Sequence, residues 1–170
     1  MTQILRLSET MAVADQLGAA DFAALKALGF RSVINNRPDG EGDEAYLPAS
    51  EAARVAARHG LAYAHLPVNG LDLTDAETVE AFERLLATLP GPVLAHCKTG
   101  TRSAILWALA QTRAMPVHEI LESTAQAGLD LSVIRPDLLE RAEHVGSVPP
   151  TPAPSGAWPQ QGLEDRQPAG

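Results

Sequence analysis

The chain has 170 residues, with 13 basic and 21 acidic side chains and a formal net charge of −8. Nucleic-acid binding needs a basic face and a membrane span needs about 20 consecutive apolar residues. The sequence shows neither feature, so we expect no nucleic-acid and no membrane partner. The single cysteine excludes an internal disulfide and favours a reducing cytoplasm. No cluster of side chains has the spacing of a zinc site, so we expect no metal and no cofactor, and the sequence leaves the oligomeric state open.

Apolar runs and helical periodicities alternate along the chain and predict an α/β fold. We expect short strands over residues 4–7, 30–34, 61–67 and 93–95, and helices over residues 21–28, 49–59, 74–89, 103–114, 117–127 and 136–145. The capping box Thr74-Asp75-Ala76-Glu77 is expected to begin the third of these helices. Strands that alternate with helices predict a central, mainly parallel sheet with helices on both faces. Ligands bind such sheets outside the carboxyl ends of the strands.

The composition of the chain changes after residue 146. Residues 147–170 contain six prolines and three glycines and show no periodicity. Such a segment buries too little apolar surface to fold alone. We therefore expect a single domain over residues 1–146, followed by a disordered proline-rich tail over residues 147–170.

The most informative stretch connects the strand at 93–95 to the helix at 103–114. It reads His96-Cys97-Lys98-Thr99-Gly100-Thr101-Arg102-Ser103. A loop between a strand and a helix can direct several backbone amides at one centre, and the helix start adds a partial positive charge. This field stabilises a thiolate and predicts that Cys97 is a nucleophile. Arg102 supplies a planar fork that can hold two oxygens of a phosphate or sulfur oxyanion, most strongly in its more charged transition state.

This stretch resembles the signature loop of the cysteine-dependent protein tyrosine and dual-specificity phosphatases. It is more similar to a bacterial family known as the β-lactamase hydrolase-like protein, phosphatase-like domain. The pattern of that family also includes residues 29–40 and 65–68, besides residues 92–103. The resemblance implies a cysteine-phosphatase-like fold over residues 1–145. It also implies a hydrolase in which Cys97 forms a phosphocysteine that water then cleaves.

Two alternatives to a phosphatase remain open. Four residues separate Cys97 from Arg102, one fewer than in the phosphatase signature, and many rhodanese-like sulfurtransferases show this shorter spacing. In such an enzyme Cys97 attacks a sulfane sulfur and carries it as a persulfide to an acceptor. The second alternative is a binding module without turnover. It would keep only the anion cradle, which is the loop from Cys97 to Arg102 together with the start of the helix that follows. All three functions require an anionic substrate or ligand.

We expect the substrate to contact the loop and one arginine outside it. The predicted substrate-binding residues are His96, Lys98, Thr99, Gly100, Thr101, Ser103 and Arg37. The resemblance implies that His96 stabilises the thiolate or braces the loop, and that the Ser103 hydroxyl helps the thiolate to leave. Gly100 is expected to allow a positive φ or a close approach of the backbone. Arg37 follows another strand that ends at the same edge of the sheet.

A phosphatase also needs a general acid for its leaving group, usually an aspartate on a neighbouring loop. The dual-specificity pattern places this aspartate shortly after residues 66–68, where the chain has Asn69-Gly70. Asp72 is the nearest carboxylate and is our prediction for the general acid. Asp39 and Asp75 are the alternatives, and the departure from the pattern favours the inactive binding module.

Overall fold

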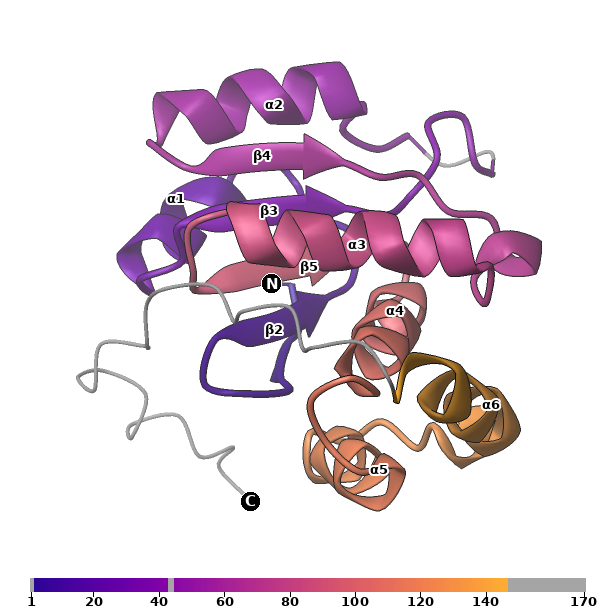
Figure 1. Ribbon diagram of the computed structural model, residues 1–170. Coiled ribbons are helices and arrows are strands. Elements are labelled where there is room, and N and C mark those ends of the chain that lie inside the picture. The colour runs from indigo at the N-terminus through magenta and orange to yellow at the C-terminus, as the bar shows by residue number, and fades with distance from the viewer. Residues whose placement is uncertain (1, 43–44, 147–170) are drawn as a thin grey trace.

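A five-stranded sheet forms the centre of the computed structural model, which describes residues 2–42 and 45–146 (Figure 1). The strands are β1 (Ile4–Arg6), β2 (Met11–Ala14), β3 (Ser32–Asn35), β4 (Ala62–His65) and β5 (Val93–His96). Their order in the sheet is β1-β2-β5-β3-β4. All neighbouring pairs are parallel except β1 and β2, which are antiparallel. The predicted α/β fold with a mainly parallel sheet is confirmed. The expected tail over residues 147–170 lies outside the described residues.

Helices cover both faces of this sheet. They are α1 (Asp21–Ala27), α2 (Ala49–Arg58), α3 (Ala76–Thr88), α4 (Thr101–Gln111), α5 (Val117–Gln126) and α6 (Arg135–Val145), with short 3₁₀ turns η1 (Gly70–Asp72) and η2 (Ser132–Ile134). One apolar core joins one face to α1 and α2, and a second core joins the other face to α3, α4, α5 and α6. Alternate residues of β2 serve the two cores, because successive side chains of a strand point to opposite faces.

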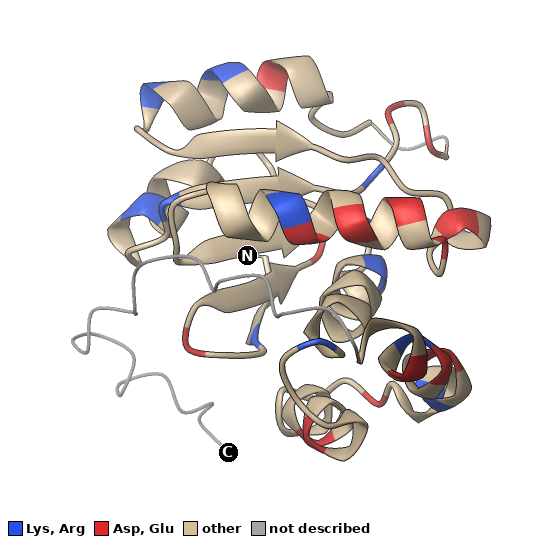
Figure 2. Ribbon diagram, in the orientation of Figure 1, with Lys and Arg blue, Asp and Glu red and all other residues tan. Residues whose placement is uncertain are grey.

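The central strand β5 and its two neighbours are completely buried between the helices on the two faces of the sheet. All four of its residues are buried, as are all four residues of β2 and of β3 on either side. No Lys, Arg, Asp or Glu lies in β2, β3, β4 or β5, so the charged residues are on helices, on loops and on the edge strand β1 (Figure 2). Strands that are covered on both faces need such uncharged sequences. The arrowheads of the four parallel strands point to one edge of the sheet, where α4 begins (Figure 1).

The structure corrects three predictions of local structure. The strand β2 was not predicted, because four residues reading Met-Ala-Val-Ala carry no period that separates a strand from a helix. The predicted capping box at Thr74 is not formed. Instead α3 begins at Ala76, and Asp75 occupies the N-cap position without a capping hydrogen bond from its side chain. Finally, α4 begins at Thr101, two residues earlier than predicted, which places Arg102 and Ser103 in its first turn.

A buried ion cluster joins the helices of the second core. The Glu83 carboxylate of α3 accepts hydrogen bonds from Arg113 Nε at 3.2 Å and from Arg141 Nη2 at 2.7 Å. Arg141 Nε also donates to the carbonyl of Leu109 at 3.1 Å, at the end of α4. All three charged side chains are about nine-tenths buried. The cluster therefore fixes α3, α4 and α6 relative to one another. No helix of the described part of the chain is long and apolar enough to cross a membrane.

We expect Glu83→Ala to lower the free energy of unfolding by about 3 kcal/mol, because it leaves two buried guanidinium groups without their counter-charge. Chemical denaturation measures this change. The matched control is Glu80→Ala on the exposed side of the same helix, for which we expect about 0.5 kcal/mol or less. Equal effects at the two positions would show that the cluster contributes little.

Candidate active site

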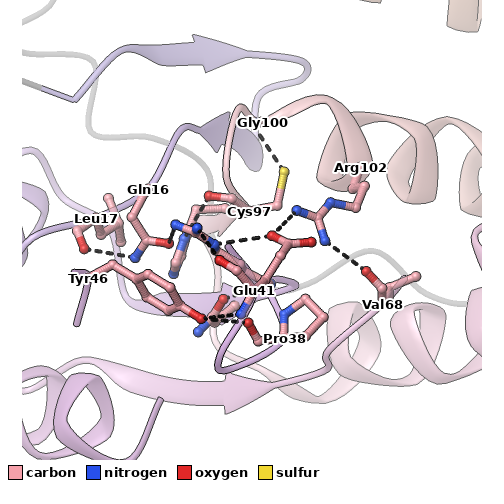
Figure 3. Close-up of polar contacts among 12 residues, drawn as sticks. Gln16, Leu17, Pro38, Glu41, Tyr46, Val68, Cys97, Gly100 and Arg102 are labelled. Atoms are coloured by element: carbon pink, nitrogen blue, oxygen red, sulfur yellow. Dashed lines mark hydrogen bonds and ion pairs between the residues drawn. The ribbon is translucent and has the colours of Figure 1, made fainter. Parts of the chain in front are cut away.

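Cys97 lies directly after β5 and is fully buried. The backbone N–H of Gly100 donates a hydrogen bond to Cys97 Sγ at 3.1 Å (Figure 3). A backbone donor directed at the sulfur fits the anion-binding loop that the sequence predicts, and the nucleophilic role of Cys97 stays a prediction. Gly100 has φ +89°, and a Cβ atom there would lie 3.2 Å from the carbonyl oxygen of Ala14. The expected positive φ and the expected close approach of the backbone are therefore both present at Gly100.

Arg102 extends from the first turn of α4 towards two acceptors. Its Nη2 donates to Glu41 Oε2 at 2.7 Å, and its Nη1 donates to the carbonyl of Val68 at 3.0 Å (Figure 3). Partial burial opposes the positive charge, but the hydrogen bond to Glu41 and the negative charges of Cys97 and Glu41 raise the pKa of Arg102 above its usual value. The cysteine loop and the exit of β4 thus meet at this guanidinium.

Glu41 is a residue of the candidate site that the sequence analysis missed. It lies in the loop after β3, and the same Oε2 that binds Arg102 also accepts from Arg37 Nε at 3.1 Å. The hydrogen bond from Arg102 is the main reason that the pKa of Glu41 lies below its usual value, although burial opposes the shift. Its carboxylate is therefore ionised at neutral pH. The loop's position after a parallel strand was the one signal in the sequence that could have drawn attention to it.

Arg37 lies beside the cradle but is itself buried, with 1% of its surface exposed. Its guanidinium stacks 3.7 Å from the ring centroid of Tyr46. Its Nη1 donates to Gln16 Oε1 at 3.1 Å, and its Nη2 donates to the carbonyl of Glu41 at 2.8 Å. These contacts give Arg37 a supporting role for the loop that carries Glu41. Direct contact of Arg37 with a substrate stays a prediction.

His96 is buried at the end of β5, with 1% of its surface exposed. Its Nδ1 lies 3.4 Å from the carbonyl oxygen of Cys97, and its Nε2 has no hydrogen-bond partner among the described residues. Burial is the main cause that lowers the pKa of His96 from 6.5 to about 4. The ring is therefore neutral at physiological pH and adds no positive charge beside the thiolate. Of the two roles proposed for His96, the geometry favours bracing the loop.

The other predicted loop residues divide into a buried and an exposed group. Ser103 is fully buried, and its hydroxyl donates to Asn36 Oδ1 at 2.8 Å. Lys98, Thr99 and Thr101 are exposed at the rim, and the Thr99 hydroxyl donates to that of Thr101 at 3.2 Å. The rim residues are accessible to a ligand, whereas Ser103 connects the loop to β3.

The three candidate acids have different surroundings. Asp72 ends η1 and is exposed, on the segment whose Val68 carbonyl binds Arg102. Asp39 accepts a hydrogen bond from the backbone N–H of Ala49 at 3.0 Å, at the start of α2. Asp75 occupies the N-cap position of α3. The side chain of Asp39 therefore has a structural role at a helix start, whereas Asp75 makes no capping hydrogen bond and only its charge is favourable at the start of α3. No group of three or more His, Cys, Asp and Glu side chains in the described ranges could hold a metal ion.

The chain has an α/β fold of the protein-tyrosine-phosphatase type, with a cysteine–arginine loop at the end of its central strand. Two solved structures are similar to this one. A kinase associated phosphatase superposes with TM-score 0.60 and 16% identity, covering 86% of this chain and 96% of that one, and so supports the fold alone. A candidate phosphatase from Neisseria meningitidis superposes with TM-score 0.73 and 34% identity, covering 81% of this chain and 97% of that one.

Sequence comparison gives the family. The chain belongs to the β-lactamase hydrolase-like protein, phosphatase-like domain family, which matches residues 3–114. Beta-lactamase hydrolase-like proteins are 43% identical over 110 residues in Xylella fastidiosa and 42% identical over 108 residues in Agrobacterium fabrum. The matches cover 64% and 63% of this chain but only 25% and 24% of those proteins. The chain thus corresponds to about a quarter of the length of these relatives.

The buried neutral His96 predicts a pH dependence of stability. Its pKa is about 4 in the folded protein against 6.5 ordinarily, so between these values the unfolded chain binds a proton that the folded chain does not. The contribution of neutral His96 to the free energy of unfolding is then fully present above pH 6.5. It decreases as the pH falls, by about 3 kcal/mol when pH 4 is reached. Denaturation at a series of pH values measures the slope. We expect His96→Gln to flatten it, and His118→Gln, which removes an exposed histidine, to leave it unchanged.

Proposed function

We propose that the chain is a cysteine-dependent hydrolase of phosphate esters. The observation that carries this proposal is the Gly100 N–H at 3.1 Å from Cys97 Sγ, directly before a helix whose first turn carries Arg102. A nucleophilic sulfur, a helix start and a two-pronged cation are together what phosphoryl transfer through a phosphocysteine needs. The reaction requires no cofactor. Membership of a phosphatase-like family supports the proposal.

The proposed reaction has two steps. Cys97 Sγ attacks phosphorus, the bond to the ester oxygen breaks, and Asp72 gives a proton to that oxygen. Water then gives a proton to the Asp72 carboxylate and attacks the phosphorus of the phosphocysteine, the bond from phosphorus to sulfur breaks, and phosphate and the Cys97 thiolate are released with help from the Ser103 hydroxyl. Arg102 holds two non-bridging oxygens and stabilises the charge that develops on them. Lys98, Thr99 and Thr101 contact the substrate from the rim.

Sulfur transfer is the second candidate function. The four-residue spacing between Cys97 and Arg102 favours it, because a persulfide needs fewer donors than a phosphoryl group with three oxygens. In this reaction Cys97 attacks the outer sulfur of thiosulfate, sulfite leaves, and the persulfide passes its sulfur to cyanide or a thiol. The nucleophile is the same, so the two functions differ in substrate rather than in site.

One comparison distinguishes the two reactions. We expect the protein to hydrolyse an aryl phosphate with modest efficiency and to be inhibited by vanadate, because both occupy the anion cradle. Cys97→Ser is expected to abolish turnover, since a hydroxyl is a far weaker nucleophile than a thiolate at neutral pH. Phosphate release and thiocyanate formation from thiosulfate and cyanide are measured on one preparation. Efficient, Cys97-dependent thiocyanate formation with negligible phosphate release would establish the sulfurtransferase instead.

The role of Asp72 is tested through the leaving group. General acids contribute about 10²- to 10⁴-fold to a rate, and only where the leaving oxygen needs a proton. We expect Asp72→Asn to slow the hydrolysis of alkyl phosphates by about 10²-fold or more and that of nitrophenyl phosphate far less. Asp75→Asn, three residues along, is the matched control. Equal losses on both substrates would indicate a structural role for Asp72.

A further inference from the structure

Arg102, which is proposed to bind the substrate, already binds the Glu41 carboxylate in this structure. Arg102 Nη2 donates to Glu41 Oε2 at 2.7 Å, and its Nη1 donates to the Val68 carbonyl at 3.0 Å. Both terminal nitrogens of its fork are therefore engaged (Figure 3). Charge-assisted hydrogen bonds of this length are among the stronger ones in proteins. An oxyanion that binds Arg102 with two prongs must compete with these contacts.

The loop after β3 holds the backbone of Glu41 in a defined position. Glu41 stands between Gly40 and Gly42, whose φ angles are +78° and +80°, a conformation that favours glycine. Its backbone N–H donates to the Tyr46 hydroxyl at 2.9 Å, and its carbonyl accepts from Arg37 Nη2 at 2.8 Å. The Tyr46 hydroxyl in turn donates to the Pro38 carbonyl at 2.9 Å. The backbone of Glu41 is thus held on both sides while its side chain reaches the cradle.

The charges at the site explain what this contact does. Glu41 is ionised at neutral pH, because its pKa is lowered by the hydrogen bond from Arg102. Its negative charge offsets the positive charge that would attract an oxyanion. Cys97 is fully buried in the same arrangement. An entering oxyanion must therefore displace the Glu41 carboxylate before it can bind Arg102 with both prongs.

We propose that Glu41 is a specificity-determining residue that occupies the oxyanion position on Arg102 until a substrate displaces it. Small inorganic oxyanions such as phosphate have no further group to offset this displacement, so they bind weakly. A substrate whose remaining part contacts the rim binds in spite of Glu41. The proposal rests on the proposed function only in that the cradle accepts an oxyanion.

Titration calorimetry with inorganic phosphate tests this role. We expect Glu41→Gln, which keeps the shape and removes the charge, to bind phosphate at least about tenfold more tightly than the original protein. Glu80→Gln makes the same change of net charge on the exposed side of α3 and should alter the affinity by less than about twofold. Glu41→Asp, which retains the charge but is one methylene shorter, should also bind phosphate more tightly because its carboxylate reaches Arg102 less well. Circular dichroism confirms that each variant is folded.

A gain of affinity separates this role from a merely structural one. If Glu41 only positioned Arg102, its replacement would weaken phosphate binding, and that result, or an unchanged affinity, would overturn the proposal. An equal gain in Glu80→Gln would also overturn it, since the effect would then be one of net charge. The titration needs no turnover. Failure of the original protein to hydrolyse phosphate esters would therefore count against the proposed function and not against the role of Glu41.

Discussion

The buried side chain of Asn36 is the junction on which the geometry of the site depends. All of its polar groups are used. Its backbone N–H donates to the carbonyl of His96 at 2.8 Å, and its backbone carbonyl accepts from the N–H of Val68 at 3.0 Å. Its side-chain amide donates to the carbonyl of Leu66 at 3.0 Å and accepts from the Ser103 hydroxyl at 2.8 Å. A fully satisfied buried amide of this kind holds the ends of β3, β4 and β5 and the start of α4 in one arrangement.

The cysteine loop and the Glu41 carboxylate are held in place by different kinds of contact. The cysteine loop is attached through backbone contacts, including the hydrogen bond from the Gln16 N–H to the carbonyl of Lys98 at 3.2 Å. The Glu41 carboxylate is instead held at the cradle by two arginine side chains. Side-chain contacts can exchange for those of a ligand without rearrangement of the sheet. The proposed exchange at Arg102 therefore involves side chains alone, while the cysteine loop stays attached to the sheet.

The sequence predicted the parts of the structure that depend on local pattern. The mainly parallel sheet, the helices on both faces and the positive φ of Gly100 all follow from periodicity and from one contiguous stretch. The remainder depends on contacts that are distant in the sequence. Glu41 and Arg102 are 61 residues apart, and Asn36 and Ser103 are 67 apart, so no local signal relates them. The strand β2 was missed for a related reason, since its four residues are identified as a strand by their pairing with β1 and β5 rather than by a pattern of their own.

The short spacing between Cys97 and Arg102 has a structural counterpart in the early start of α4. The first backbone hydrogen bond of the helix runs from the N–H of Ala104 to the carbonyl of Gly100 at 3.0 Å. The N–H groups before Ala104 in the first turn have no partner within the helix, as in any α-helix. The four-residue loop between Cys97 and Arg102 therefore leads directly into the N–H donors of the helix start. A count of the residues between Cys97 and Arg102 leaves out the N–H groups of Arg102 and Ser103, so the spacing alone is a weak argument for sulfur over phosphorus.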